Sequence, residues 1–327
     1  MASRTFLIAL LFVTSLNVTN LPGQDSGCTR RTIPVGVVDK QRVFVQGLSA
    51  ANFRGRLHGH DVQIVSASLD TNPRHIVLLV DASGSMMHPS AVWESAKSLS
   101  EYLIRHAPPQ ASIAQMGFSL SVLGSASFDQ DRLTLLKRLG DLARVCEQAQ
   151  VNRSTALYDA ISGALGSFGP LNFGDVIYAV TDGEDNASQT GPSKTKEALF
   201  TAGIRLFAVV LVPHHAVRGR VPADSEFDRL HSMVEATGGD VLAFPYQGAW
   251  RPYSALNAKT RANAVDLALQ CLCEEMGEFY RLELRSPITL DKPTKWKLEV
   301  IEANGRPGRR VEVHYPEQLM PCAKAGP

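Results

Sequence analysis

The residues best suited to chemistry are oxygen-bearing side chains at three separate places in the chain. Asp81, Ser83 and Ser85 occupy alternate positions of one short turn, and Thr155 and Asp182 stand much later. They offer two carboxylates and three hydroxyls, which are the hard oxygen donors that bind Mg²⁺, Ca²⁺ or Mn²⁺. Zn²⁺ and Cu²⁺ are not expected, because no histidine or cysteine belongs to the set.

Two apolar runs must place these groups. The run 75–80 leads directly into Asp81, and the run 175–180 ends just before Thr181 and Asp182. Such runs predict strands that are buried on both faces of a parallel sheet. Thr155 stands at the predicted start of a helix. Open α/β sheets bind ligands at the carboxyl ends of their strands, so we expect these side chains to converge there.

Alternating strands and helices between His75 and Met276 predict an α/β domain with a doubly wound, mostly parallel sheet. Strands are expected near 76–80, 112–118, 121–128, 176–181, 204–212 and 240–244. Helices are expected near 89–106, 130–146, 155–167, 193–202, 224–237 and 255–276. The two strands around Leu123-Gly124 are expected to form a hairpin, which would add an antiparallel edge strand.

The three polar motifs together resemble the metal-ion-dependent adhesion site (MIDAS) of von Willebrand factor type A (VWA) domains. The resemblance is carried by Asp-x-Ser-x-Ser at 81–85, by the Thr of Ser-Thr-Ala-Leu-Tyr-Asp-Ala at 154–160 and by Thr-Asp-Gly at 181–183. It implies a Rossmann-like VWA domain over 74–277. It also implies one divalent cation, with Ser83 and Ser85 as direct ligands and Asp81 and Asp182 acting in part through water. Such an ion captures a carboxylate of a partner protein.

The two ends of the chain have strand character instead. Strands are expected over 34–38, 42–45 and 61–65, and again over 279–284, 296–300 and 311–315. At Gly47-Leu48 and Phe53 the segment 32–70 resembles the strands that precede the VWA domain in secreted acidobacterial VWFA-related proteins. Both ends need a facing partner, so we expect the segments 32–70 and 278–316 to meet in a small β-sandwich. Residues 317–327 are expected to be a tail.

Residues 1–23 have the pattern of a secretory signal peptide. Arg4 precedes the apolar run 6–13, which is too short to span a bilayer. Cys28 offers the alternative of a lipoprotein, but Asp25 stands where an apolar residue would be needed. We therefore expect a secreted or periplasmic protein with no transmembrane segment in the mature chain.

Composition narrows the class of partner. The formal net charge is +1 and charged residues make up 20% of the chain, which argues against nucleic acid or an anionic membrane surface. Of the five cysteines, Cys28 and Cys322 flank the strand-rich ends and could pair. Cys271 and Cys273 would point to different faces of one helix, so a bond between them is not expected. Buried free thiols are the alternative.

We predict a non-enzymatic, cation-dependent module that binds a protein partner through an exposed Asp or Glu. Mg²⁺ is the expected ion, with Ca²⁺ or Mn²⁺ as alternatives. One rival is a structural envelope protein that binds through its β-sandwich and keeps a vestigial metal site. Another is a metal-assisted hydrolase, which lacks an apparent general base and a nucleophile elbow around Ser83. His58-x-His60 and His214-His215 are expected to be exposed loop residues.

Overall fold

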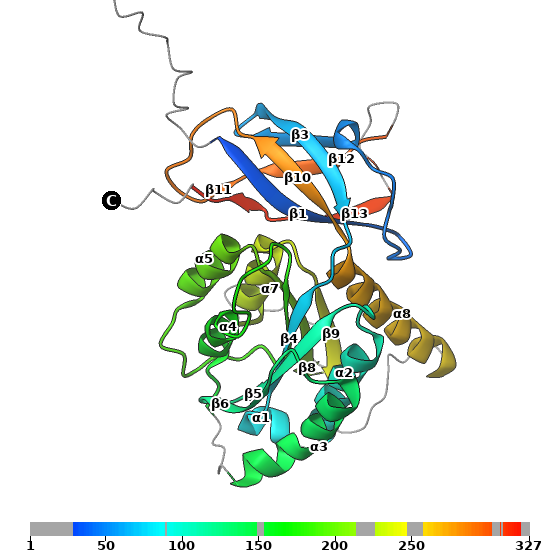
Figure 1. Ribbon diagram of the computed structural model, residues 1–327, viewed down its shortest axis with the longest axis vertical. Helices are drawn as coiled ribbons and strands as arrows, with labels where there is room; N and C mark the ends of the chain where they lie inside the picture. The colour runs from blue at the N-terminus through cyan, green and yellow to red at the C-terminus, as the bar shows by residue number, and fades with distance from the viewer. Residues whose placement is uncertain are drawn as a thin grey trace, which may run out of the picture.

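The computed structural model describes residues 29–88, 90–148, 154–213, 226–246, 258–302, 308 and 310–321. The predicted signal over 1–23, the possible Cys28–Cys322 bond and the pair His214-His215 lie outside the described residues. Two sheets organise the described chain, one α/β and one antiparallel, and they lie one above the other (Figure 1).

A six-stranded sheet forms the centre of the α/β domain, in the order β6-β5-β4-β7-β8-β9. Its strands are β4 (His75–Asp81), β5 (Ser112–Phe118), β6 (Val122–Ala126), β7 (Val176–Thr181), β8 (Arg205–Pro213) and β9 (Val241–Tyr246). Neighbours pair in parallel except β6, which runs antiparallel to β5 at the edge. The predicted doubly wound, mostly parallel sheet with its edge hairpin is confirmed.

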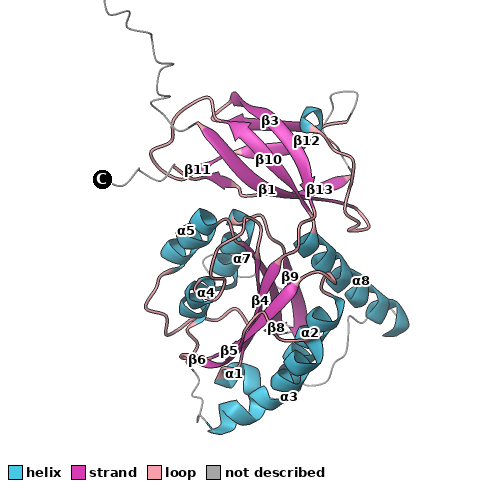
Figure 2. Ribbon diagram, viewed as in Figure 1, coloured by secondary structure: helices cyan, strands magenta, loops and turns pink. Residues whose placement is uncertain are grey.

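Helices cover both faces of this sheet (Figure 2). One face carries α1 (Gly84–Met87), α2 (Ser90–His106), α3 (Arg132–Gln148) and α8 (Ala258–Gly277), and the other carries α4 (Leu157–Leu165), α5 (Pro192–Ala202) and α7 (Glu226–Ala236). Ile76, Leu78 and Val80 of β4 enter the first core, whereas Val77 and Leu79 enter the second. Successive strand side chains point to opposite faces, which explains why the run has no polar break.

Strands from both chain ends form the second, antiparallel sheet, in the order β12-β2-β3-β10-β1-β13. They are β1 (Arg30–Asp39), β2 (Phe53–Leu57), β3 (His60–Asp70), β10 (Phe279–Arg285), β12 (Lys297–Val300) and β13 (Val311–His314). β10 lies between β1 and β3 and pairs with both, so the two ends share one sheet. The edge strands β12 and β13 also contact each other. The predicted β domain built from the two ends is confirmed, with a single apolar core.

Two details of the β domain differ from the prediction. The strand expected over 42–45 is reduced to a single antiparallel bridge between Phe44 and Val38. The carboxylate of Asp39 accepts the backbone N–H groups of Gln41 and Val43 and closes the turn that precedes it. Arg42 has a φ of 62° within that turn. A short pair, β11 (Thr294–Lys295) with β14 (Gln318–Leu319), reaches into the stretch expected to be a tail. A 3₁₀ turn over Ala50–Asn52 follows Ser49.

The α/β and β domains meet around a buried arginine. Arg205, at the start of β8, is fully buried and donates to the backbone oxygen of Glu275 on α8 at 2.6 Å. Its guanidinium lies over the rings of Phe207 and of Phe279, the first residue of β10. These contacts fix the point at which the chain passes from α8 into the antiparallel sheet.

The remaining sequence predictions concern helices and thiols. None of the helices within the described residues is long and apolar enough to cross a membrane. Cys271 and Cys273 are both buried on α8 and are not bonded to each other, as expected.

Candidate metal centre

Asp81 ends strand β4 and is fully buried. Its Oδ1 accepts the backbone N–H of Ser83 at 2.9 Å, which shapes the turn into α1. Its Oδ2 accepts the hydroxyl of Thr181 at 2.7 Å. Thr181 ends β7, the neighbouring strand, so the two strand ends are joined by a side-chain hydrogen bond.

Two serines extend this group. The Oγ atoms of Ser83 and Ser85 lie 3.2 Å apart, and Ser83 is fully buried while Ser85 is partly buried. The hydroxyl of Ser85 also hydrogen-bonds the carboxylate of Asp182. Four of the five predicted residues therefore belong to one connected group at the carboxyl ends of β4 and β7.

The electrostatics of this group favour a cation. Burial, together with the nearby charge of Asp182, raises the pKa of Asp81 to about 7. Burial also raises the pKa of Asp182, and the charge of Asp182 in turn raises the pKa of the exposed Glu184. Within the described residues, neither Asp81 nor Asp182 forms an ion pair with a basic side chain. Burial and the charge of Asp182 thus stabilise the protonated form of Asp81, and a bound cation would reverse this effect.

Thr155 is held at the same end of the sheet by backbone hydrogen bonds. Its N–H donates to Asn186 Oδ1 at 2.8 Å, and its carbonyl accepts the N–H groups of Asn186 and Ala187 at 3.0 and 3.1 Å. The next residue, Ala156, donates to the carbonyl of Ser119 at 2.8 Å. Thr155 is therefore fixed between the loops that follow β5 and β7. It precedes α4, which begins at Leu157, by two residues.

The hydroxyl of Thr155 supplies the test of whether a cation fits. The residue is 1% exposed, and Thr155 Oγ1 has no hydrogen-bond partner among the described residues. A buried hydroxyl without a partner destabilises a fold unless something else satisfies it. A hard cation would use this oxygen as a ligand, so the residues present fit the ion that the sequence implies.

Several supporting residues could not be recognised from the sequence. Thr181 and Asn186 bind Asp81 and Thr155, and Asp185 Oδ2 accepts the N–H of Tyr158 at 3.1 Å. The only available signal was the density of polar residues after β7. Asn186 and Asp185 bind backbone groups 31 and 27 positions away, and Thr181 binds a carboxylate 100 positions away, which no local pattern reveals.

A second group of potential ligands lies between the two domains and had no sequence signal. Asp240, Glu275 and His314 each place one ligand atom within 4.8 Å of the others. His314 Nδ1 lies 2.7 Å from Glu275 Oε2, and Arg42 forms ion pairs with Asp240 and Glu275. Burial opposes a charge on His314, but hydrogen bonds to Glu275 and Glu312 outweigh it and raise its pKa to about 10. The group therefore contains two basic side chains of its own, Arg42 and His314. We call Arg42, Asp240, Glu275 and His314 the interdomain charge cluster.

The strand order, the helices on both faces and the polar group at the ends of β4 and β7 define a VWA-like α/β domain protein. The antiparallel domain built from the two chain ends accompanies it. No protein-family model matches the sequence, and no curated protein matches it.

Three solved structures are similar in fold. The conserved hypothetical protein BatB from Bacteroides thetaiotaomicron is 17% identical, with 60% of this chain and 98% of that chain covered and a TM-score of 0.41. A von Willebrand factor type A protein from Catenulispora acidiphila is 12% identical, with 89% and 73% covered and a TM-score of 0.44. The VWA domain of SpRpn10 is 13% identical, with 54% and 91% covered and a TM-score of 0.40. These similarities concern the fold alone.

Proposed function

We propose that this chain is a cation-dependent protein-binding module whose site consists of Asp81, Ser83, Ser85, Thr155 and Asp182. The observation that carries the proposal concerns groups at one end of the sheet. Among the described residues, the buried hydroxyl of Thr155 has no hydrogen-bond partner and the two carboxylates have no basic partner. A structural turn would not need to bury uncompensated groups of this kind.

The donor set also selects the class of cation. Three hydroxyls and two carboxylates are all oxygen donors, which supports Mg²⁺ first and Ca²⁺ or Mn²⁺ as alternatives. When bound, the ion would supply positive charge and an exchangeable position that a carboxylate of a partner protein can occupy. The chain's own contribution is to hold the donors rigidly, through Thr181 on Asp81 and Asn186 on Thr155.

Apolar surface beside the site suits a protein partner. Leu120 and Val122 are 54% and 47% exposed, on the hairpin between β5 and β6. The preceding residue, Ser119, accepts the N–H of Ala156 and so ties this hairpin to the Thr155 loop. A partner that places an Asp or Glu at the metal would also cover these side chains and gain hydrophobic contact.

We further propose that the protein acts as a binding protein outside the cytoplasm and not as an enzyme. The signal-like pattern of residues 1–23 supports the location. The donor set supports binding, since its groups serve an ion and no separate nucleophile is needed to explain them.

Calorimetry with Mg²⁺ on the full chain tests the site. The wild type should bind one equivalent with a dissociation constant on the order of 10⁻⁴ to 10⁻³ M. Thr155→Val removes the hydroxyl and keeps the shape, so metal affinity should fall while the melting temperature does not. Thr201→Val, on the exposed surface of α5, is the matched control. Equal metal affinity in Thr155→Val and wild type would reject the site.

A pull-down with and without chelator tests the function. Partner capture should require Mg²⁺ and should be lost in Thr155→Val. Capture that persists in excess chelator, by a protein that binds Mg²⁺ normally, would assign binding to the β domain instead.

A further inference from the structure

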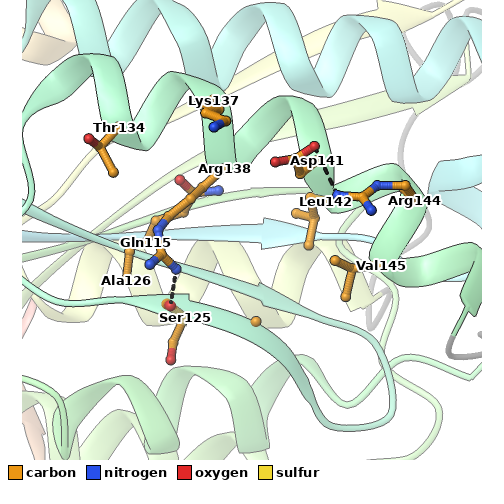
Figure 3. Close-up of a pocket in the computed structure, with 11 residues that line it drawn as sticks. Gln115, Ser125, Ala126, Thr134, Lys137, Arg138, Asp141, Leu142, Arg144 and Val145 are labelled. Atoms are coloured by element: carbon orange, nitrogen blue, oxygen red, sulfur yellow. Dashed lines mark hydrogen bonds and ion pairs between the residues drawn. The ribbon is translucent and has the colours of Figure 1, made fainter.

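A cavity of about 460 Å³ opens between the edge of the α/β sheet and helix α3 (Figure 3). Gln115 of β5 and Ser125 and Ala126 of β6 form its strand side, and Lys137 and Arg138 are among the α3 residues on its other side. We name it the α3 pocket. No residue of the candidate metal centre lines it.

Beside the pocket, α3 packs closely on β5. Leu142 lies directly over Gly117, where an added Cβ would come within 2.5 Å of its Cδ1. Gln115 points to the same face of the sheet, two residues earlier. Around Gln115 the side of the pocket that α3 forms includes both polar side chains and the apolar Leu142 and Val145.

This polar face of α3 lies beside the row of side chains that anchors the helix. Its polar members recur at helical spacing: Thr134, Lys137, Arg138 and Asp141. The helix is anchored by another row, in which Leu135, Leu139 and Leu142 enter the core. Lys137 and Arg138 of the polar row are exposed, so their charged groups lie at the mouth of the pocket.

The buried side chain of Gln115 indicates that the pocket binds a ligand. Its side chain is 4% exposed and lines the pocket, and its Oε1 has no hydrogen-bond partner within the described chain. A buried amide oxygen is stable only if a donor reaches it. The protein supplies none among the described residues, so the donor must enter from the pocket.

The charges around the pocket indicate that the ligand also carries a negative charge. Arg138 donates to the carbonyl of Ser125 at 3.0 Å, and Asp141 pairs with Arg144 at 3.2 Å (Figure 3). The pairing with Arg144 offsets the negative charge of Asp141. Lys137 forms no ion pair within the described residues, so the ammonium group of Lys137 and the guanidinium of Arg138 leave an excess of positive charge at the mouth.

We propose that the α3 pocket binds a small organic carboxylate that also carries an amide N–H. The N–H donates to Gln115 Oε1, and the carboxylate faces Lys137 and Arg138. The volume suits a ligand of this size. Free N-acylated amino acids and the C-terminal residue of a peptide share this chemistry. The inference does not depend on the metal centre.

Titration of the full chain with N-acetylglycine, followed by calorimetry or by amide chemical shifts, tests the proposal. Binding should saturate. Acetate, which lacks the N–H, and N-acetylglycinamide, which lacks the charge, should each bind at least about fivefold more weakly. Absence of saturable binding, or equal affinity for N-acetylglycine and acetate, would overturn the proposal.

Two variants check the contacts. Gln115→Met keeps the length of the side chain and removes the unpartnered oxygen, so the protein should fold with an unchanged or higher melting temperature and lose at least about fivefold in affinity. Lys137→Gln should lose about as much, whereas Lys194→Gln, exposed on α5, should bind as wild type does. Wild-type affinity in Gln115→Met contradicts the assignment.

An acetylated tripeptide ending in glycine distinguishes the two sources of the ligand. Tighter binding than N-acetylglycine indicates a peptide C-terminus, and equal or weaker binding indicates a free carboxylate.

Discussion

The hydroxyl of Thr181 donates a 2.7 Å hydrogen bond to the carboxylate of Asp81, and both groups are fully buried at the ends of adjacent parallel strands. The bond therefore has two roles. It gives the buried carboxylate of Asp81 a hydrogen-bond donor, which a charged group in a low-dielectric interior needs. It also fixes the orientation of that carboxylate towards Ser83 and Ser85.

Removing this bond should be destabilising. Thr181→Val keeps the shape and leaves Asp81 with one fewer donor, so the free energy of unfolding should fall by about 1–3 kcal/mol. Thr155→Val is the matched control, because it removes a buried hydroxyl that satisfies nothing in the described chain and should leave stability nearly unchanged. Urea unfolding in the presence of chelator measures both. Equal losses of unfolding free energy in the two variants would contradict the prediction, because the hydroxyl of Thr181 would then stabilise the fold no more than that of Thr155.

The charge of Asp182 should be visible in the titration of Asp81. Burial raises the pKa of Asp81 first, and the charge of Asp182 adds to it, giving about 7. Asp182→Asn removes only the second cause, so in metal-free protein the pKa of Asp81 should move down but stay above its ordinary value. Carboxyl carbon chemical shifts followed against pH measure this. An Asp81 that titrates identically in both proteins would mean that the carboxylates do not interact.

Much of the α/β domain could be predicted from the sequence because burial on both faces leaves a strong signal. The runs that become β4 and β7 contain no polar interruption, and their flanking polar residues mark where each strand ends. The short helix α1 was not predicted, since four residues carry no periodicity. Its position directly after Ser83 depends on the hydrogen bond from the Ser83 N–H to Asp81.

The β domain could be predicted only in part. The alternation over 279–284 indicates a strand but says nothing about its neighbours, and β10 pairs with both β1 and β3 from the other end of the chain. The interdomain charge cluster could not be predicted for the same reason. Arg42, Asp240, Glu275 and His314 come from four distant segments, so no spacing in the sequence could reveal it.

The interdomain charge cluster should make stability depend on pH. The folded protein raises the pKa of His314 from its ordinary 6.5 to about 10, through hydrogen bonds to Glu275 and Glu312 that outweigh burial. The folded state therefore favours the protonated form, so this contribution is complete below about pH 6.5 and is lost as the pH rises through 10. The unfolding free energy should fall with pH over that window, and less so in His314→Gln.

The control for this experiment is His231→Gln, at a partly exposed position on α7. It should keep the wild-type dependence on pH, because it leaves the interdomain charge cluster intact. A wild-type slope in His314→Gln as well would mean that His314 has the same proton affinity in the folded and unfolded chains.

The apolar hairpin beside the metal centre should contribute to partner binding without contributing to metal binding. Leu120 is 54% exposed and lies next to Ser119, whose carbonyl holds the Thr155 loop through Ala156. A side chain already in water stabilises the free protein little, so Leu120→Ser should leave the melting temperature and the Mg²⁺ affinity unchanged. If a partner covers the hairpin, the same change should weaken partner capture by about tenfold or more, since burying a leucine contributes roughly 1.5–3 kcal/mol.

The matched control is Leu171→Ser, which is exposed on the segment between α4 and β7 and should capture the partner normally. Equal capture by Leu120→Ser and wild type, in a protein that still needs Mg²⁺, would place the partner on another side of the metal.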